Sequence, residues 1–244
     1  MDSRVPEIRK HLKKKLDAYR YEHTLGVEFT CQALAMRYGY DLDKADLAGL
    51  LHDSAKRFEN PVMLQKCLDR GIPVTAEEER DPSLLHAKLG AWMAENKYGV
   101  DDPEILSAIT CHTTGKPGMG LLDKILYVAD YIEPRRSKAA NLPEMRKLAF
   151  IDLDQACFEI MESILEYLKS TGCQIDPMTE AACQDMRRVV SERKKETAGE
   201  ASAGTGITHQ DKEEQSVESV KRNGKACSRG FGREKRRRCK NYRH

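Results

Sequence analysis

Apolar residues recur at three- and four-residue spacing along most of the chain, which is the pattern of amphipathic α-helices. The pattern is clearest over residues 5–18, 21–38, 42–56, 121–132, 144–150 and 153–168. No segment alternates apolar and polar residues as a half-buried strand does, and no internal repeat is visible. We therefore expect an all-α fold with roughly eight to ten helices joined by short turns.

Proline and glycine residues mark several of the expected helix ends. Asp81-Pro82, Asp102-Pro103 and Asp176-Pro177 each place an N-cap aspartate before a proline at the first helical position. Gly39 stands where the second helix is expected to end, and Pro134 stops the helix of residues 121–132.

The helical pattern fades after about Val190, and the composition changes with it. Residues 191–244 are rich in charged and small residues and have few that could form a core. They carry 15 Lys+Arg against 8 Asp+Glu, whereas residues 1–190 carry 26 against 31. We expect a folded, acidic domain over residues 1–190 and a disordered, low-complexity basic tail over residues 191–244.

The basic tail has the charge to bind RNA or another polyanion nonspecifically. Only Phe231 and Tyr242 interleave its basic region with aromatic rings, so we favour a solvated linker. No apolar stretch approaches the roughly 20 residues of a membrane span. The eight cysteines form no Cys-x-x-Cys pair and no signal peptide is visible, so we expect reduced thiols and a cytoplasmic protein. The oligomeric state is left open, with a homodimer among the alternatives.

Histidine and aspartate residues interrupt the most apolar parts of the helical pattern. The clearest case is the pair His52-Asp53, in the run AGLLHDSAK of residues 48–56. An unpaired carboxylate in a buried helix is costly, and a divalent metal ion compensates it while also using the neighbouring imidazole. An exposed polar pair at a helix end is the alternative reading of this motif taken alone.

The same anomaly recurs at four further positions, which are His23, His86, His112 and Asp130. A single histidine of this kind is more often a satisfied core or surface residue than a metal ligand. The set is better explained together, as one metal centre built from five helices. Adjacent helical residues point about 100° apart, so His52 and Asp53 can share a centre only from a helix end or by facing two ions.

These residues, in this order and with the longer blocks around them, resemble the bacterial YqeK family of the HD-domain phosphohydrolase superfamily. The matching blocks are residues 48–56, 85–91, 108–115 and 127–136. Members of that family are symmetrical diadenosine tetraphosphate hydrolases with a two-iron centre. The resemblance covers roughly residues 5–190 and implies an HD-domain helical bundle. The tail has no counterpart in it.

The resemblance also implies a set of six metal ligands, which are His23, His52, Asp53, His86, His112 and Asp130. Asp53 would bridge two divalent ions, expected to be iron, although manganese, zinc and nickel also suit such ligands. Water would attack an inner phosphorus of the substrate, ADP would be the leaving group, and two ADP molecules would be the products.

Basic and hydroxyl residues next to these ligands are candidates for binding phosphates. Lys56 follows Asp53 by one helical turn, and Arg135 follows Asp130 beyond a proline. Thr113, Thr114 and Gly115 come directly after His112, with a plain helix-terminating turn as the alternative. The expected catalytic set is Asp53, Lys56, His112 and Arg135, and the expected substrate-binding set is Lys56, Thr113, Thr114, Gly115 and Arg135.

Arg136 and Lys116 are weaker candidates, because exposed basic residues are common. The sequence thus predicts a metal-dependent, symmetrical bis(5'-nucleosyl)-tetraphosphatase. Two alternatives stay open: a generic HD-domain nucleotidase acting on mononucleotides, and a nucleotide-sensing or RNA-associated binding protein with a non-catalytic metal site. A product assay on dinucleotides and mononucleotides distinguishes the predicted enzyme from the generic nucleotidase. Slow turnover with tight, metal-dependent binding would favour the second.

Overall fold

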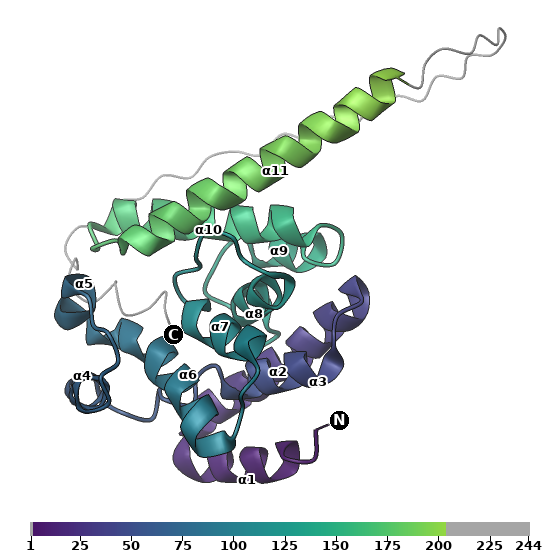
Figure 1. The fold of residues 1–244 in the computed structure, drawn as a ribbon. Helices are drawn as coiled ribbons and strands as arrows, with labels where there is room; N and C mark the ends of the chain where they lie inside the picture. Colours follow the sequence, from purple (N-terminus) through teal and green to yellow (C-terminus); the bar gives the residue numbers. More distant parts are fainter. Residues whose placement is uncertain (1, 204–244) are drawn as a thin grey trace, which may run out of the picture. The chain divides into compact units, whose positions relative to one another are not determined.

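The structure is a computed structural model, and it describes residues 2–203 of the 244-residue chain. All regular secondary structure in this part is helical, which confirms the all-α prediction (Figure 1). The helices are α1 (Val5–Lys15), α2 (Ala18–Tyr38), α3 (Leu42–Leu51), α4 (Asn60–Asp69), α5 (Ala76–Arg80), the 3-10 helix η1 (Pro82–Leu84), α6 (Leu85–Tyr98), α7 (Pro103–Cys111), α8 (Leu121–Ile132), α9 (Leu142–Leu148), α10 (Leu153–Thr171) and α11 (Pro177–Ala203).

Several helix ends carry the caps that the sequence predicts. The Asp102 side chain accepts a hydrogen bond from the Glu104 amide at the start of α7, and Gly39 ends α2 in the left-handed conformation with φ 67°. Asp81 instead begins a short 3-10 turn, where its side chain accepts from the Ser83 amide. The prediction of an α-helix starting at Pro82 is therefore wrong by three residues, because α6 begins at Leu85.

The end of α3 differs more from the prediction, and it matters for the site because His52 and Asp53 lie there. We predicted a helix through Lys56, but α3 ends at Leu51 and the chain continues through consecutive turns to Arg57. In these turns the Ser54 amide donates to the Leu51 carbonyl, and the Lys56 amide donates to the Asp53 carbonyl. Since i to i+3 bonds replace the helical ones, His52 and Asp53 stand at a helix end.

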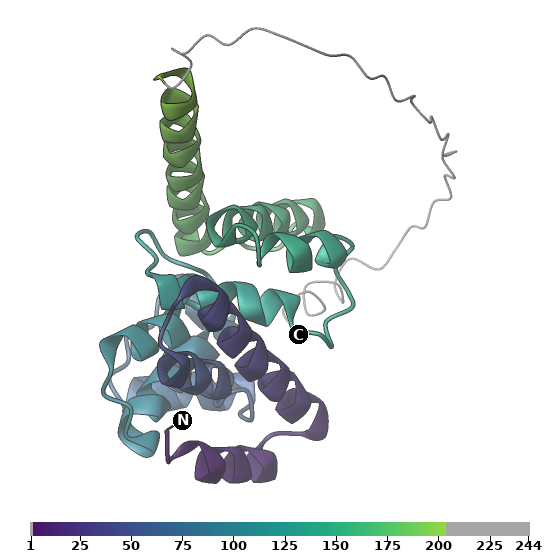
Figure 2. The same cartoon turned by 90° about the vertical axis from the view of Figure 1, so that its right-hand side faces the viewer.

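Helices α2, α3, α7 and α8 form the centre of the folded domain, with α6 packed on α7 and α4 on α6 (Figures 1 and 2). The large side chains in this core are aliphatic and fully buried, for example Leu50, Leu51, Ile125 and Leu126. Gly49 lets α3 approach α2 closely, because a Cβ atom there would lie 2.7 Å from the Cα of Glu28. The central helices are thus fixed at short range where the ligand residues emerge.

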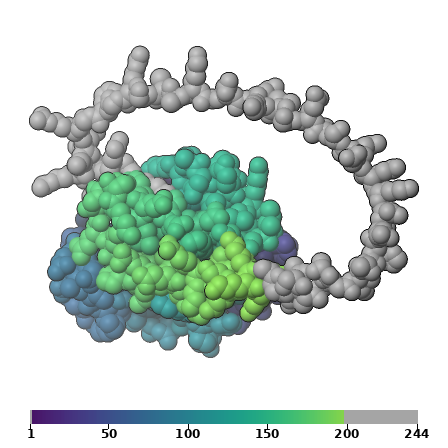
Figure 3. Space-filling model, turned by 90° about the horizontal axis from the view of Figure 1, so that it is seen from above, coloured from purple at the N-terminus to yellow at the C-terminus, as the bar shows by residue number. Residues whose placement is uncertain are grey.

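Helices α9 and α10 pack against α8, and the first part of α11 completes this side of the core. Residues of α9 to α11, drawn in green, lie in the middle of the face seen in Figure 3, with residues of earlier helices at its edge. Contacts divide the chain after Val190, which is buried, while α11 itself continues to Ala203. The predicted tail therefore begins inside α11, and residues 204–244 lie outside the described residues.

Two smaller expectations also bear on the fold. None of the helices in the described part of the chain is both long and apolar enough to cross a membrane. Cys31, Cys67, Cys111, Cys157 and Cys183 are free thiols and all are buried. Cys31, Cys157 and Cys183 pack in the main hydrophobic core and Cys67 in a second apolar cluster, as small apolar residues do.

Candidate metal centre

The six candidate ligands converge at one place from five helices. His23 comes from α2, His52 and Asp53 from the end of α3, His86 from the first turn of α6, His112 from the end of α7 and Asp130 from α8. The first five are buried, with relative exposures of 0–3%, and the Asp130 side chain is 21% exposed. Tertiary packing thus brings the six residues together, and their role as metal ligands stays a prediction.

Asp53 lies at the middle of the group, with each carboxylate oxygen facing a different pair of imidazoles. Its Oδ2 atom lies 3.6 Å from Nε2 of His52 and 3.8 Å from Nε2 of His23. Its Oδ1 atom lies 3.5 Å from Nε2 of His86 and 3.7 Å from Nε2 of His112. A carboxylate with this surrounding can serve two ions at once.

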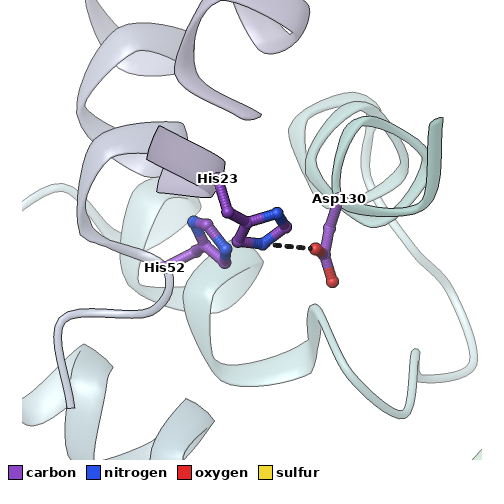
Figure 4. Close-up of side chains that lie close together, drawn as sticks. All are labelled: His23, His52 and Asp130. Carbon is purple, nitrogen blue, oxygen red and sulfur yellow. Dashed lines mark ion pairs between the residues drawn. The ribbon is translucent and has the colours of Figure 1, made fainter. Parts of the chain in front are cut away.

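Asp130 completes one side of the centre. Its Oδ1 atom lies 3.1 Å from Nε2 of His23, and Figure 4 shows the two side chains pointing toward one another with the His52 ring beside them. Ligand atoms of His23, His52 and Asp130 lie within 4.8 Å of one another, as do those of His52, Asp53 and His112. His52 belongs to both groups.

Helix-end geometry fixes the tautomer of three histidines. Each donates its Nδ1 proton to the carbonyl of the residue three positions earlier: His52 to Gly49 at 2.7 Å, His86 to Ser83 at 2.5 Å and His112 to Ile109 at 2.7 Å. The proton on Nδ1 leaves the Nε2 lone pair for the centre. The His52 Nε2 atom is buried and has no hydrogen-bond partner among the described residues.

His23 is fixed by a carboxylate that the sequence reasoning missed. Its Nδ1 atom lies 3.1 Å from Oε1 of Glu133, which is 1% exposed. A Cβ atom on Gly26 would stand 2.5 Å from Oε2 of Glu133, so this glycine makes room for the carboxylate. The sequence spacing could have identified Glu133, because it follows Asp130 by three residues at the end of the same helix.

The carboxylates of the centre are held in the charged form. Burial alone would raise the pKa of Asp53, but His52, His112, Arg20 and Lys56 together hold it well below its usual range. The pKa of Asp130 is likewise low despite burial, because Arg136 and His23 lie beside it. Anionic carboxylates are what a divalent cation requires of its ligands.

The histidines divide into two kinds. Burial lowers the pKa of His52 to about 4 and that of His86 well below its ordinary value, so both are neutral near pH 7. Burial also opposes the charge of His23, but its contacts with Asp130 and Glu133 outweigh burial and raise its pKa to about 9. A metal ion must therefore displace a proton from His23.

Two arginines, one buried and one partly buried, contact the ligand carboxylates from outside the centre. Arg20, which is 8% exposed, places Nη1 at 2.7 Å from Oδ2 of Asp53. Arg136 places Nη2 at 2.7 Å from Oδ1 of Asp130. Sequence reasoning missed Arg20, although it precedes His23 by three residues and so shares its helix face.

This donor set fits divalent transition metal ions. Four imidazole Nε2 atoms and two carboxylates converge, the Nε2 atom of His52 has no hydrogen-bond partner among the described residues, and the three fixed tautomers present lone pairs inward.

Comparison with known proteins identifies relatives of this chain. Residues 20–135 match the model of the HD domain family. The chain is 40% identical over 168 residues to the symmetrical bis(5'-nucleosyl)-tetraphosphatase of Bacillus subtilis. This alignment covers 69% of this chain and 89% of that protein. The enzyme of the same name from Halalkalibacterium halodurans is 37% identical over 172 residues, covering 69% of this chain and 89% of that one.

The chain belongs to the YqeK family of HD-domain hydrolases. A solved structure from Clostridium acetobutylicum, described as a predicted HD superfamily hydrolase involved in NAD metabolism, supports the fold. Its TM-score is 0.73 at 36% identity, covering 75% of this chain and 96% of that chain.

In this YqeK-family member, two of the predicted substrate-binding residues lie beside the metal centre. Thr113 places Oγ1 at 3.1 Å from Nε2 of His86. Lys56 lies in the turn after Asp53, and its positive charge lowers the pKa of both Asp53 and His86.

Two other predicted residues serve the end of α7. Thr114 donates its hydroxyl to the Gly115 carbonyl, and the Gly115 amide donates to the Cys111 carbonyl at 2.7 Å. Both bonds belong to a helix-terminating turn, which was the alternative reading.

The structure does not bring the predicted Arg135 into the centre. The side chain of Arg135 is 54% exposed and pairs with Glu22, whereas Arg136 contacts Asp130 through both its carboxylate and its carbonyl. The reason is the turn after Pro134, in which the Arg136 amide donates to the Glu133 carbonyl and the chain folds back over α8. Lys116 lies elsewhere and pairs with Asp123 at 3.0 Å.

Proposed function

We propose that this chain hydrolyses dinucleoside polyphosphates, diadenosine tetraphosphate above all, symmetrically to two nucleoside diphosphates. The observation that carries the proposal is the placement of Asp53, whose two oxygens face two separate pairs of inward-pointing imidazole nitrogens. Membership of the YqeK family and the names of its relatives support the same activity. The cytoplasmic location expected from the sequence is part of this proposal.

The finer proposal for the cofactor is two divalent ions, iron foremost, with manganese, zinc and nickel as alternatives that suit the same ligands. When bound, such ions neutralise charge on phosphoryl oxygens and lower the pKa of water. The residues that would hold them are the six ligands, with Asp53 shared between the two.

The chain's own residues have distinct parts in this proposal. Arg20 holds Asp53 in place, and Glu133 holds the ring of His23. Lys56 and Thr113 stand where phosphate oxygens would approach the ligands, one as a positive charge and the other as a hydroxyl donor. Arg136, whose guanidinium is already beside Asp130, takes the place near the centre that we had assigned to Arg135.

The cleavage position tests the proposal and separates it from its alternatives. Protein purified without oxygen is analysed for metal and then incubated with diadenosine tetraphosphate, and the first products are separated by chromatography. ADP as the sole nucleotide product is expected, and in heavy-oxygen water a single turnover should place the solvent oxygen on one of the two ADP molecules.

Other product patterns contradict the proposal in different ways. AMP plus ATP as first products would contradict the symmetrical geometry while leaving the ligands in place. Turnover of mononucleotides in preference to the dinucleotide would favour the generic nucleotidase. Tight metal-dependent binding without turnover would favour the sensor.

A further inference from the structure

Basic side chains from three separate segments gather beside the turn that follows the metal centre. We name this group the basic cluster, and its members are His11, Lys14, Lys15, Arg57 and Lys97. The Lys97 ammonium donates to Nε2 of His11 at 2.8 Å, and the His11 ring meets the Tyr98 ring edge-on at 5.9 Å. The C-terminal ends of α1 and α6 therefore meet here.

No carboxylate within residues 2–203 compensates the charge of the cluster. Among the described residues, Lys14, Lys15, Arg57 and Lys97 form no ion pair with a carboxylate within 4.0 Å. The buried Nε atom of Arg57 and the hydroxyl of Tyr98 have no hydrogen-bond partner in the part of the chain that the structure describes. Arg57 stacks instead on the Phe58 ring, with its guanidinium carbon 4.5 Å from the ring centre. Buried donors without partners are uncommon and call for an explanation.

Repulsion within the cluster is visible at two of its members. Burial lowers the pKa of His11, and the neighbouring charges of Lys97, Arg57, Lys15 and Lys14 lower it further. Burial likewise lowers the pKa of Lys97, with added repulsion from Arg57 and Lys15. The two helix C-termini offset only about half a negative charge each, so they leave most of the four positive charges uncompensated.

The surroundings favour a compact anion over a long nucleic acid. Residues 1–190 carry 26 Lys+Arg against 31 Asp+Glu, so an extended polyanion would meet net repulsion beyond the cluster. A short phosphate chain needs only the local charge. The Phe58 and Tyr98 rings lie beneath Arg57 and Lys97 and help to hold these two cations in place.

The cluster is also within reach of the metal centre. Arg57 follows Asp53 by four residues, so their Cα atoms are at most about 14 Å apart even in a fully extended chain. We propose that the basic cluster is a second anion site, which binds an outer phosphate of the phosphate chain of a nucleoside polyphosphate while phosphates nearer the middle of that chain occupy the metal centre. This inference rests on the proposed function for the identity of the substrate.

The test uses a double variant, Lys15→Ala with Lys97→Ala, in the full-length, metal-loaded protein. Its matched control is Lys147→Ala with Lys169→Ala, which removes the same charge from exposed positions on α9 and α10. With diadenosine tetraphosphate, we expect the cluster variant to raise KM about tenfold, the size expected for two exposed charge contacts, and to leave kcat within about twofold. The control variant should change neither constant.

A second readout does not depend on turnover. Inorganic tripolyphosphate is titrated into the zinc-loaded protein while the His11 ring proton signals are followed by NMR. We expect saturable shifts in the unmodified and control proteins and shifts at about tenfold higher concentration in the cluster variant. If the unmodified protein does not cleave the dinucleotide, the proposed function fails while this titration still decides the anion site.

Two outcomes would overturn the anion site. One is identical KM and tripolyphosphate affinity in the cluster and control variants. The other is a cluster variant that loses affinity for a single-stranded RNA oligonucleotide but keeps its affinity for tripolyphosphate, because that result would assign the cluster to RNA.

Discussion

Two acidic groups of the folded domain differ in how their charge is held: one is the metal centre, with Asp53 after α3 and Asp130 on α8, and the other lies between α2 and α3. In the metal centre, Asp53 and Asp130 each contact an arginine and histidines, and their pKa values are well below the usual range. The second group, which we name the carboxyl pair, is Glu28 with Asp46 beside Arg9. Burial and the neighbouring Asp46 raise the pKa of Glu28 to about 8, although Arg9 opposes the shift.

The carboxyl pair shows that burial of two carboxyl groups does not by itself make a metal site. Arg9 reaches Glu28 at 2.8 Å but Asp46 only at 3.9 Å, and three of the four carboxyl oxygens have no hydrogen-bond partner among the described residues. One positive charge cannot hold two buried carboxylates, so the pair keeps a proton. The centre differs because imidazole lone pairs and two arginines surround its carboxylates.

One residue connects the two groups. Gly49 packs against the backbone of Glu28, and its carbonyl accepts the Nδ1 proton of His52. The position of the carboxyl pair and the orientation of a ligand are thus set by the same close approach of α2 and α3.

The largest expected effect comes from removing a carboxylate of the centre. Asp53→Ala should abolish metal binding and lower turnover by more than about 100-fold, since loss of an outer partner alone costs about 10–100-fold. Helical content by circular dichroism should be largely kept. Asp46→Asn is the matched control from the carboxyl pair and should keep metal and turnover. An Asp53→Ala protein that retains both ions and substantial turnover would refute the ligand assignment.

The next effect concerns Glu133, which acts on the centre through His23. Glu133→Ala should weaken metal affinity by about 10–100-fold in a chelator competition, because nothing then fixes the His23 ring. Glu133→Gln should restore most of the affinity, since its amide oxygen can accept the same proton. Glu22→Ala is an exposed control. Equal affinities in Glu133→Ala and Glu22→Ala would show that Glu133 does not position the ligand.

A smaller effect is expected on thermal stability, where the carboxyl pair should make the melting temperature depend on pH. Folding raises the pKa of Glu28 from 4.5 to about 8, so its contribution to stability is fully present below about pH 4.5 and is lost as pH rises through 8. Glu28→Gln mimics the protonated form and should flatten the decline of Tm between pH 5 and 9 relative to the unmodified protein. A change of one kcal/mol corresponds to about 2–4 °C in a domain of this size. An exposed control, Glu7→Gln, should leave the pH profile unchanged, and an unchanged profile in Glu28→Gln would contradict the shared proton.

The smallest effect is expected from the tail, because its sequence has few core-forming residues and offers no candidate ligand. Ending the chain after Val190 should leave kcat and KM within about twofold. A second truncation after Ala203 keeps all of α11. If only the shorter protein fails to fold or act, the functional domain extends to the end of α11 and our boundary at Val190 is misplaced.

Much of the site could be predicted from the sequence because its residues violate the local pattern. Histidines and aspartates in apolar helices are costly unless they share a task, and that argument selected all six ligands that converge here. Lys56 and Thr113 were found by adjacency to a ligand along the chain, and both lie at the centre. These inferences needed only composition, helical period and short spacing.

The misassigned and missed residues depend on where the chain turns. The sequence favoured Arg135 over Arg136, and the turn after Pro134 decided the reverse by folding the chain back onto Asp130. Glu133 gains its role only because α8 ends beside Gly26 of α2, a contact between residues far apart in the sequence. No periodicity encodes such contacts.

The sequence by itself determined the helical class, the ligand residue types and their order, because hydrophobic period and the cost of burying charge act locally. Only the tertiary structure decided that α3 stops at Leu51 so that His52 and Asp53 act from a helix end, and that the carboxyl pair keeps a proton while the centre stays anionic. The reason is physical: the protonation and orientation of a buried group depend on the charges and carbonyls that other helices place within a few ångströms of it.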